Sequence, residues 1–183
     1  MYNKFIQNAI PSFLLNDNIY KSNTATQQGG ALYLYNGYST GTQNVNASTF
    51  ESNSSAEGGA VYVSDSYNTV SMGGNTYTNN SANLGGAIYA DGKDVIASSG
   101  SFTGNSATQQ GGAIYNKNRL VAAGTTFTGN TAVEGGAIYN KGTLNINAVT
   151  QNVLFSNNYT ENDVGGGAIW NTRTLNLNAT GGN

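Results

Sequence analysis

Residues Phe102 to Tyr115 read Phe-Thr-Gly-Asn-Ser-Ala-Thr-Gln-Gln-Gly-Gly-Ala-Ile-Tyr, and the two halves of this stretch recur along the chain. The second half, Gly-Gly-Ala-aliphatic-aromatic, occurs six times at spacings of 29, 27, 26, 24 and 31 residues. The second glycines of the six copies are Gly30, Gly59, Gly86, Gly112, Gly136 and Gly167. A short period sustained over most of a chain indicates a repeat architecture in which each copy is one structural unit.

The first half, an aromatic residue followed three positions later by asparagine, also occurs six times. Its asparagines are Asn23, Asn53, Asn80, Asn105, Asn130 and Asn158. Between the motifs, apolar and polar residues alternate over short stretches such as Leu144 to Ile146, and clusters of Gly, Asn and Ser separate these stretches. Alternation with period two predicts short strands joined by tight turns, and the repeats have no helical period.

These patterns predict an all-β fold, a parallel β-helix (β-solenoid) with one coil per repeat and about six to seven coils. The repeats fill residues 19–183 as one elongated domain, which we expect to be a fragment of a longer protein. Residues 1–18 differ in character. Their apolar side chains, among them Phe5, Ile6 and Phe13, lead us to expect an N-terminal segment that caps the first coil.

Stacking explains why each residue recurs. Equivalent residues of neighbouring coils lie about 4.7–4.9 Å apart, so side chains of the same kind pack against one another. The aliphatic residue of each glycine block, such as Ile114, is expected in the core. The asparagines are expected to form a structural ladder that satisfies the backbone groups of a buried turn. The paired glycines indicate a corner where φ is positive or where a side chain would collide with the next coil.

The aromatic residue after each aliphatic residue is expected on the opposite face of its strand. These residues then form an outward aromatic ladder, which is the candidate binding surface: Tyr33, Tyr62, Tyr89, Tyr115, Tyr139 and Trp170. Exposed Tyr and Trp are typical anchors for a partner. The structural alternative, which we weigh above it, is that the rings only stabilise the strands by stacking on one another.

The composition excludes several classes of protein. Only 9% of the 183 residues are charged, and the net charge is −2 with no basic run, which argues against a nucleic-acid partner. His and Cys are absent, so the usual zinc ligands, the thiolate nucleophile and the commonest general base are missing. We expect no metal and no cofactor. We also expect no membrane insertion by this segment, because it lacks an apolar run of about 18 residues.

An enzyme is the less favoured alternative, since a fold of this kind can also carry catalytic sites. Asp65 and Asp91 occupy similar positions in adjacent repeats, Asp94 follows closely, and Lys93 is the only nearby base. Glycoside hydrolysis requires a pair of carboxylates and a lyase requires a base. Asp is an ordinary turn residue in such loops, so we predict that the chain is not an enzyme.

Ice binding is a third alternative, because ranks of threonine on one face of a solenoid can order water. Thr103 and Thr128 occupy equivalent positions. The series is broken at Glu51 and Ser156, so we give ice binding little weight.

The alternating Gly-Gly-Ala-[Ile/Leu/Val] and aromatic-x-x-Asn motifs, over about Ile19 to Leu177, resemble the repeats of chlamydial polymorphic outer-membrane proteins and related adhesin-like autotransporter passengers. The resemblance implies a right-handed coil, export, and display at the bacterial cell surface for adhesion. Its partner would be a cell-surface glycan or protein, bound by the side face and by loops at Tyr35 to Val45 and Leu144 to Leu154. The alternative is a structural stalk, or a filament subunit that self-associates end to end through unpaired strand edges.

Overall fold

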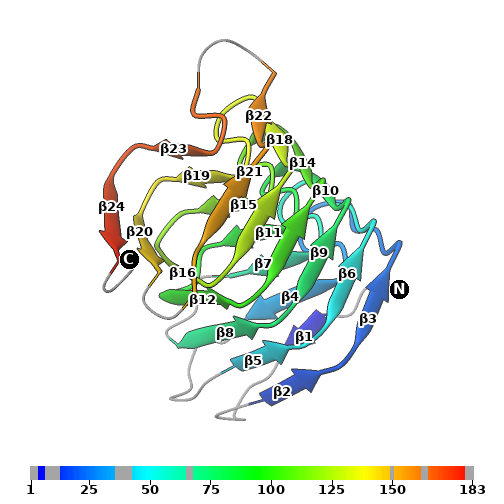
Figure 1. The fold of residues 1–183 in the computed structure, drawn as a ribbon. Coiled ribbons are helices and arrows are strands. Elements are labelled where there is room, and N and C mark those ends of the chain that lie inside the picture. The colour runs from blue at the N-terminus through cyan, green and yellow to red at the C-terminus, as the bar shows by residue number, and fades with distance from the viewer. Residues whose placement is uncertain are drawn as a thin grey trace.

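The computed structural model describes residues 4–6, 13–35, 43–64, 68–148, 151–161 and 165–179. Within these ranges the chain forms strands and no helix. The strands belong to four parallel sheets, here named A to D, which run side by side along the molecule (Figure 1). Between Val61 and Thr160 each coil passes through sheets A, B, C and D in turn, whereas within the described ranges the two coils before Val61 have strands in sheets A, B and C only. The structure confirms a parallel β-solenoid, with about six turns.

Each sheet collects equivalent strands from successive coils. Sheet A contains β1 (Lys4–Ile6), β4 (Leu32–Tyr35), β7 (Val61–Val63), β11 (Ile88–Ala90), β15 (Ile114–Asn116), β19 (Ile138–Asn140) and β23 (Ile169–Asn171). Sheet B contains β2 (Phe13–Asn16), β5 (Gln43–Asn46), β8 (Thr69–Gly73), β12 (Asp94–Ser98), β16 (Arg119–Ala123), β20 (Thr143–Asn147) and β24 (Thr174–Asn178). Sheet C contains β3 (Ile19–Lys21), β6 (Thr49–Glu51), β9 (Thr76–Thr78), β13 (Ser101–Thr103), β17 (Thr126–Thr128) and β21 (Leu154–Ser156). Sheet D contains β10 (Ser81–Leu84), β14 (Ser106–Gln110), β18 (Thr131–Ala132) and β22 (Tyr159–Thr160).

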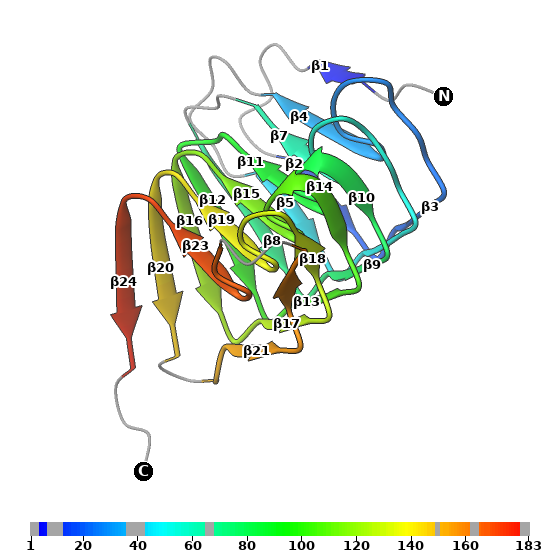
Figure 2. The same cartoon turned by 90° about the horizontal axis from the view of Figure 1, so that it is seen from above.

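The register of these sheets aligns equivalent positions of the repeats. In sheet A, Ile88 pairs with Ile114 and Tyr89 pairs with Tyr115. Because side chains alternate across a strand, this register turns each sequence position into a column that lies either inside or outside the solenoid. Figure 2 shows the coils stacked in chain order, with β1 to β3 at one end and β23 and β24 at the other.

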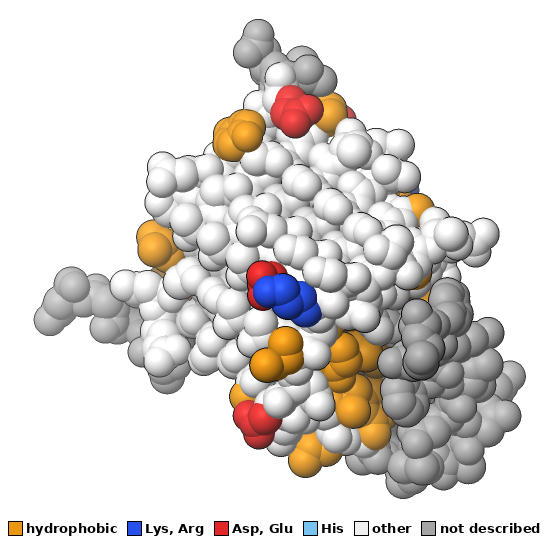
Figure 3. All heavy atoms as spheres, turned by 90° about the vertical axis from the view of Figure 1, so that its right-hand side faces the viewer, with side chains coloured by type: hydrophobic (Ala, Val, Ile, Leu, Met, Phe, Trp, Pro, Cys, Tyr) orange, Lys and Arg blue, Asp and Glu red, His pale blue; other side chains and the backbone are white. Residues whose placement is uncertain are grey.

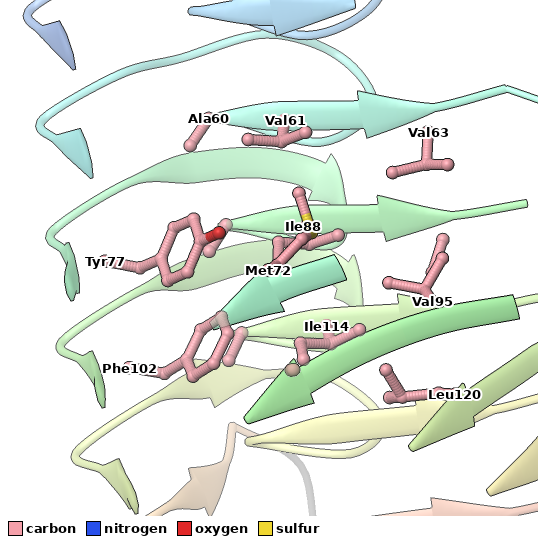
Figure 4. Packing of buried hydrophobic residues seen from close by; sticks show 14 of the residues in the cluster. Ala60, Val61, Val63, Met72, Tyr77, Ile88, Val95, Phe102, Ile114 and Leu120 are labelled. Carbon is pink, nitrogen blue, oxygen red and sulfur yellow. The ribbon is translucent and has the colours of Figure 1, made fainter. Parts of the chain in front are cut away.

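The core consists of inward columns from sheets A, B and C. Figure 4 shows Val61, Ile88 and Ile114 of sheet A above one another, and beside them Tyr77 and Phe102 of sheet C. The Tyr77 and Phe102 rings are stacked, with their centroids 4.5 Å apart. All five side chains are at most 1% exposed, and burial of such a side chain contributes about 1.5–3 kcal/mol. Apolar burial therefore replaces the disulfides that the chain lacks.

A neighbouring asparagine explains why Tyr77 is tolerated in this core. The hydroxyl of Tyr77 lies within the fully buried aromatic column, and the side-chain Nδ2 of Asn75 donates a hydrogen bond to it at 3.2 Å. A buried hydroxyl without a partner would cost free energy. Asn75 therefore allows Tyr to stand where other coils have Phe.

The predicted asparagines stack beside this column, and Asn80 shows their hydrogen bonds. Its Nδ2 donates to Oδ1 of Asn105 in the next coil at 3.0 Å and to the carbonyl of Phe50 in the previous coil at 2.9 Å. Its backbone N–H donates to the same Oδ1 of Asn105 at 3.0 Å. The side-chain bonds run through all six residues: Asn23, Asn53, Asn80, Asn105, Asn130 and Asn158.

The paired glycines lie where the chain turns from sheet D into sheet A. The two glycines of a pair are required for different reasons. Gly58 has a φ of +62°, which favours glycine. Gly59 has no room for a side chain, because a Cβ there would lie 2.1 Å from the carbonyl oxygen of Gly86. The same crowding occurs at Gly30, Gly86, Gly112 and Gly136, whereas the nearest atom to a Cβ on Gly167 is at 3.1 Å.

Residues 1–18 contribute two strands to the solenoid. β1 pairs with β4 and β2 pairs with β5, so both extend sheets of the repeats. Phe13 and Leu15 pack against the main core, whereas Leu14 is 62% exposed. Residues 7–12 lie outside the described ranges. A capping role for this segment, and a domain boundary at residue 18, stay predictions.

Candidate functional site

The aromatic ladder lies outside the main core, along sheet A. Four of its tyrosines form a hydrophobic cluster of their own, against which Tyr33 and Trp170 pack: Tyr62, Tyr89, Tyr115 and Tyr139. Neighbouring rings in this cluster are stacked, with centroids 4.8 to 5.4 Å apart. Such stacking contributes about 0.5–1.5 kcal/mol per pair beyond area burial.

These rings are less exposed than an outward ladder predicts. Tyr115 is 5% exposed and Tyr89 is 7% exposed. Rings of the neighbouring coils lie against each phenol, and Leu84 of sheet D packs against the cluster. The ladder is therefore a second, outer hydrophobic core, whose edge alone reaches solvent. A role of the ladder in binding stays a prediction.

Burial also sets the protonation of the ladder. It raises the pKa of Tyr89 well above the ordinary value of 10.0, and the neighbouring phenols and the carboxylates of Glu57 and Asp91 raise this pKa further. Burial likewise raises the pKa of Tyr115 and of Tyr139, although a hydrogen bond with the Gln110 side chain lowers the pKa of Tyr139 in part. Tyr89, Tyr115 and Tyr139 are therefore uncharged at neutral pH.

Next to the aromatic ladder, each coil has a segment that runs from just after the asparagine of the aromatic-x-x-Asn motif to the second glycine, such as residues 81–86. This segment includes the strands of sheet D, and we call it the lobe of that coil. A Cβ on Gly59 would also lie 2.5 Å from the carbonyl oxygen of Ser81. The end of one lobe therefore lies against the start of the lobe in the next coil. Along the lobes, Gln28 donates a hydrogen bond to Glu57 at 3.0 Å, and Gln110 donates one to Glu134 at 2.6 Å.

The lobes also carry a hollow with a volume of about 370 Å³. It spans four coils, and the side chains that line it are mostly amides: Gln27, Gln28, Ala56, Glu57, Asn83, Leu84 and Gln109. None of these residues was singled out as a candidate site from the sequence. The signal was present in the sequence as amide residues directly before three of the glycine pairs or one position earlier, at Gln27 and Gln28, at Asn83, and at Gln109 and Gln110, but the hollow itself depends on how the coils align.

The carboxylates of the enzyme alternative are held in ion pairs with the next coil. Asp91 is 7% exposed and lies 2.7 Å from the Lys117 ammonium, and Asp94 pairs with Arg119. Asn118 also donates a hydrogen bond to Asp91 at 2.9 Å. Both carboxylates thus have structural partners that the sequence did not reveal.

The enzyme alternative also involves Lys93 and Asp65. Lys93, the proposed base, is exposed, and Asp65 lies outside the described residues. Residues 36–42 and 149–150, which belong to the two loops expected to bind a partner, also lie outside them. Among the described residues, no group of three or more His, Cys, Asp or Glu is placed to hold a metal ion.

A second asparagine ladder occupies the corner between sheets A and B. Nδ2 of Asn116 donates to Oδ1 of Asn140, and Nδ2 of Asn140 donates to Oδ1 of Asn171, each at 2.6 Å. The sequence signal was an asparagine directly after the aromatic residue in the last three glycine blocks. The ladder begins at Asn116, because the residue paired with it in the preceding coil is Ala90.

No helix in the described part of the chain is long and apolar enough to cross a membrane. The fold and the stacked columns define a class, the parallel β-solenoid repeat protein. A family model then identifies the repeat: the Chlamydia polymorphic membrane protein repeat matches residues 47–64, 78–91, 99–117, 124–141 and 152–172. The chain therefore carries repeats of this family in five segments, as the motifs led us to expect. No curated protein and no solved structure matches it significantly.

Proposed function

We propose that the chain is a surface-displayed, non-enzymatic β-solenoid of an exported bacterial protein, and that it binds a host or neighbouring-cell surface through its side faces and loops. The observation that carries this proposal is the fivefold match to a repeat of membrane proteins, on a fold that is a stack of coils. A stack of this kind presents long side faces, and binding by repeat proteins commonly uses such faces.

The chemistry of the outer surface supports contact with an uncharged polar partner. Figure 3 shows one face on which uncharged polar groups and backbone predominate. On the outward side of sheet C, the register aligns Thr76 with Ser101 and Ser101 with Thr126. A parallel column joins Thr78, Thr103 and Thr128. Hydroxyl and amide groups can both donate and accept hydrogen bonds, so they suit neutral polar surfaces.

Binding of the purified chain to cultured epithelial cells tests the proposal. We expect saturable binding that a heat-unfolded sample does not show. A face-by-face comparison then locates the contact: one variant carries Gln27→Ala, Asn83→Ala and Gln109→Ala on the lobes. A second variant carries Thr76→Ala, Ser101→Ala and Thr126→Ala on sheet C, and the variant that loses binding identifies the face in contact. Absence of saturable binding to any cell type would contradict the adhesive function.

A filament subunit is the second candidate, and one feature of sheet B favours it. Leu177 of β24 pairs with Ile146 of β20, whose side chain is buried in the core, so Leu177 belongs to an inward apolar column that a further coil would continue. An unpaired edge with an apolar side chain can pair with another molecule. We expect sedimentation velocity to show concentration-dependent assembly that Leu177→Asp abolishes. A monomer at all concentrations would exclude this candidate.

A further inference from the structure

The hollow in the lobes forms where a column of amide side chains is interrupted. Backbone hydrogen bonds place the lobes in order, since the N–H of Glu57 donates to the carbonyl of Gln27 and the N–H of Asn83 donates to that of Ala56. Ala56 therefore stands between Gln27 and Asn83 in neighbouring coils. It carries one methyl group where its neighbours carry amides, and the missing volume opens the hollow.

The hydrogen-bonding groups around the hollow are incompletely used. No hydrogen bond joins the side-chain amide of Gln27 or Gln109 to another residue of the described ranges, and both side chains are exposed. Oδ1 of Asn83 accepts a hydrogen bond from Thr108, which leaves its Nδ2 available, and Oε2 of Glu57 accepts one from Gln28. Donors and acceptors thus alternate along the hollow, over an apolar patch formed by Ala56 and Leu84.

This pattern selects among classes of ligand. Amides that can both donate and accept are matched by hydroxyl groups, which also do both. Glu57 is the only charged residue of the lining, so an anionic ligand would be repelled by it. Gln27 and Gln109 are three coils apart, which corresponds to about 14 Å at the spacing of neighbouring strands, so the hollow suits an extended ligand. Its volume of about 370 Å³ lies within the range of small-molecule sites.

We propose that this hollow binds a short, neutral oligosaccharide, in an extended conformation along the stack of lobes. The proposal rests on the proposed surface-binding function and names the chemistry of its partner. The sugar hydroxyls pair with the amides of Gln27, Asn83 and Gln109, and the apolar face of a sugar ring lies over Ala56 and Leu84.

Ala56→Gln is the variant that tests the site most directly. It restores the interrupted column and fills the hollow without removing any group that pairs elsewhere. Thr103→Gln is the matched control, because it adds the same side chain to the exposed face of sheet C. Saturation-transfer NMR with neutral tetrasaccharides of glucose, galactose and N-acetylglucosamine measures binding, and a sialylated tetrasaccharide serves as the anionic probe. Circular dichroism checks that each variant is folded.

We expect the wild-type chain and Thr103→Gln to bind at least one neutral tetrasaccharide equally, and Ala56→Gln to bind it more than tenfold more weakly. Gln109→Ala should weaken binding about fivefold, the loss of one hydrogen bond. The sialylated probe should bind more weakly than the neutral one, and Glu57→Gln should reduce that difference. Equal binding by folded Ala56→Gln, or no binding of any neutral tetrasaccharide by the wild type, would overturn the proposal.

The cell-binding assay separates this proposal from the proposed function. If the wild type and folded Ala56→Gln bind cells equally and neither binds a tetrasaccharide, the assignment of the hollow fails while adhesion stands. If the wild type binds tetrasaccharides and no cells, adhesion fails while the hollow remains a sugar site.

Discussion

The side-chain nitrogen of Asn80 lies 3.0 Å from the side-chain oxygen of Asn105, one coil further along the solenoid. The same oxygen accepts the backbone N–H of Asn80, and Nδ2 of Asn105 donates to the carbonyl of Tyr77. The side chain of Asn105 thus satisfies groups of the preceding coil, and its Nδ2 also donates to Oδ1 of Asn130 in the next coil at 3.0 Å. We expect Asn105→Ala to lower the free energy of unfolding by about 1–3 kcal/mol, because buried polar groups lose their partners.

Urea denaturation measures this loss. The control is Asn145→Ala, since Asn145 accepts a hydrogen bond from Asn176 in an exposed ladder on sheet B. That control should cost less than about 0.5 kcal/mol, as is usual for surface changes. Equal losses for the two variants would contradict a special role of the buried ladder.

Tyr115→Ser tests whether the aromatic ladder is an outer core. The ring is 5% exposed and stacks on Tyr89 and Tyr139, so we expect a loss of about 3 kcal/mol, close to that of a core aromatic. Tyr159→Ser is the control, because Tyr159 is 56% exposed. Thermal unfolding followed by circular dichroism compares the two. A small loss at Tyr115 would mean that the ladder is open to solvent, as an adhesive face would require.

Gly59→Ala tests the close approach of neighbouring lobes. The added Cβ would lie 2.1 Å from the carbonyl oxygen of Gly86, which is backbone and cannot move aside, so we expect a loss of about 3 kcal/mol or more. Gly129→Ala is the control. Gly129 has a φ of +62°, but no atom lies within 4 Å of a Cβ there, and Ser52 adopts the same conformation in another coil.

The left-handed conformation alone costs about 1–2 kcal/mol, so Gly129→Ala should be the milder change. Chemical denaturation of both variants gives the comparison. A milder effect at Gly59 than at Gly129 would show that conformation, and not the contact between lobes, makes the glycine pair necessary.

Stability should fall at alkaline pH. Burial raises the pKa of Tyr89 and Tyr115 above the ordinary value of 10.0. Above about pH 10 an unfolded chain loses these protons while the folded chain keeps them, so the free energy of unfolding decreases as pH rises. Below that pH both states are protonated, and these groups cause no dependence. Melting temperatures from about pH 8 to about pH 11 should show a decline that is smaller in Tyr89→Phe than in the wild type. A decline of the same size in Tyr89→Phe would contradict this cause.

The second asparagine ladder should show a graded response. Asn140 donates to Asn171 and accepts from Asn116, whereas Oδ1 of Asn116 is buried without a partner among the described residues. Oδ1 of Asn140 also accepts the backbone N–H of Gly142, so we expect Asn140→Ala to cost about 1–2 kcal/mol more than Asn116→Ala, the contribution of two further hydrogen bonds. Urea denaturation measures both. A larger loss at Asn116 would be inconsistent with the directed ladder.

The repeats alone predicted the parallel solenoid, the inward aliphatic column and the columns to which the aromatics and asparagines belong. This was possible because one rule, the stacking of each coil on the next, converts a period in the sequence into contacts in space. The pairing of Phe102 with Phe127 follows from the motif spacing in this way. The ion pair between Lys117 and Asp91 was missed, because it belongs to no motif and joins residues 26 positions apart.

The sequence by itself determined which residues stack on one another, because equivalent positions of successive coils must meet wherever the backbone pairs in parallel. The tertiary structure alone decided what covers the outward columns, because that depends on the path of the chain between the motifs. The lobe folds back beside sheet A, so Leu84 covers tyrosines that alternation alone would leave exposed. The same lobes bring Gln27, Ala56 and Asn83 together across three coils, and only there does a small side chain become a hollow.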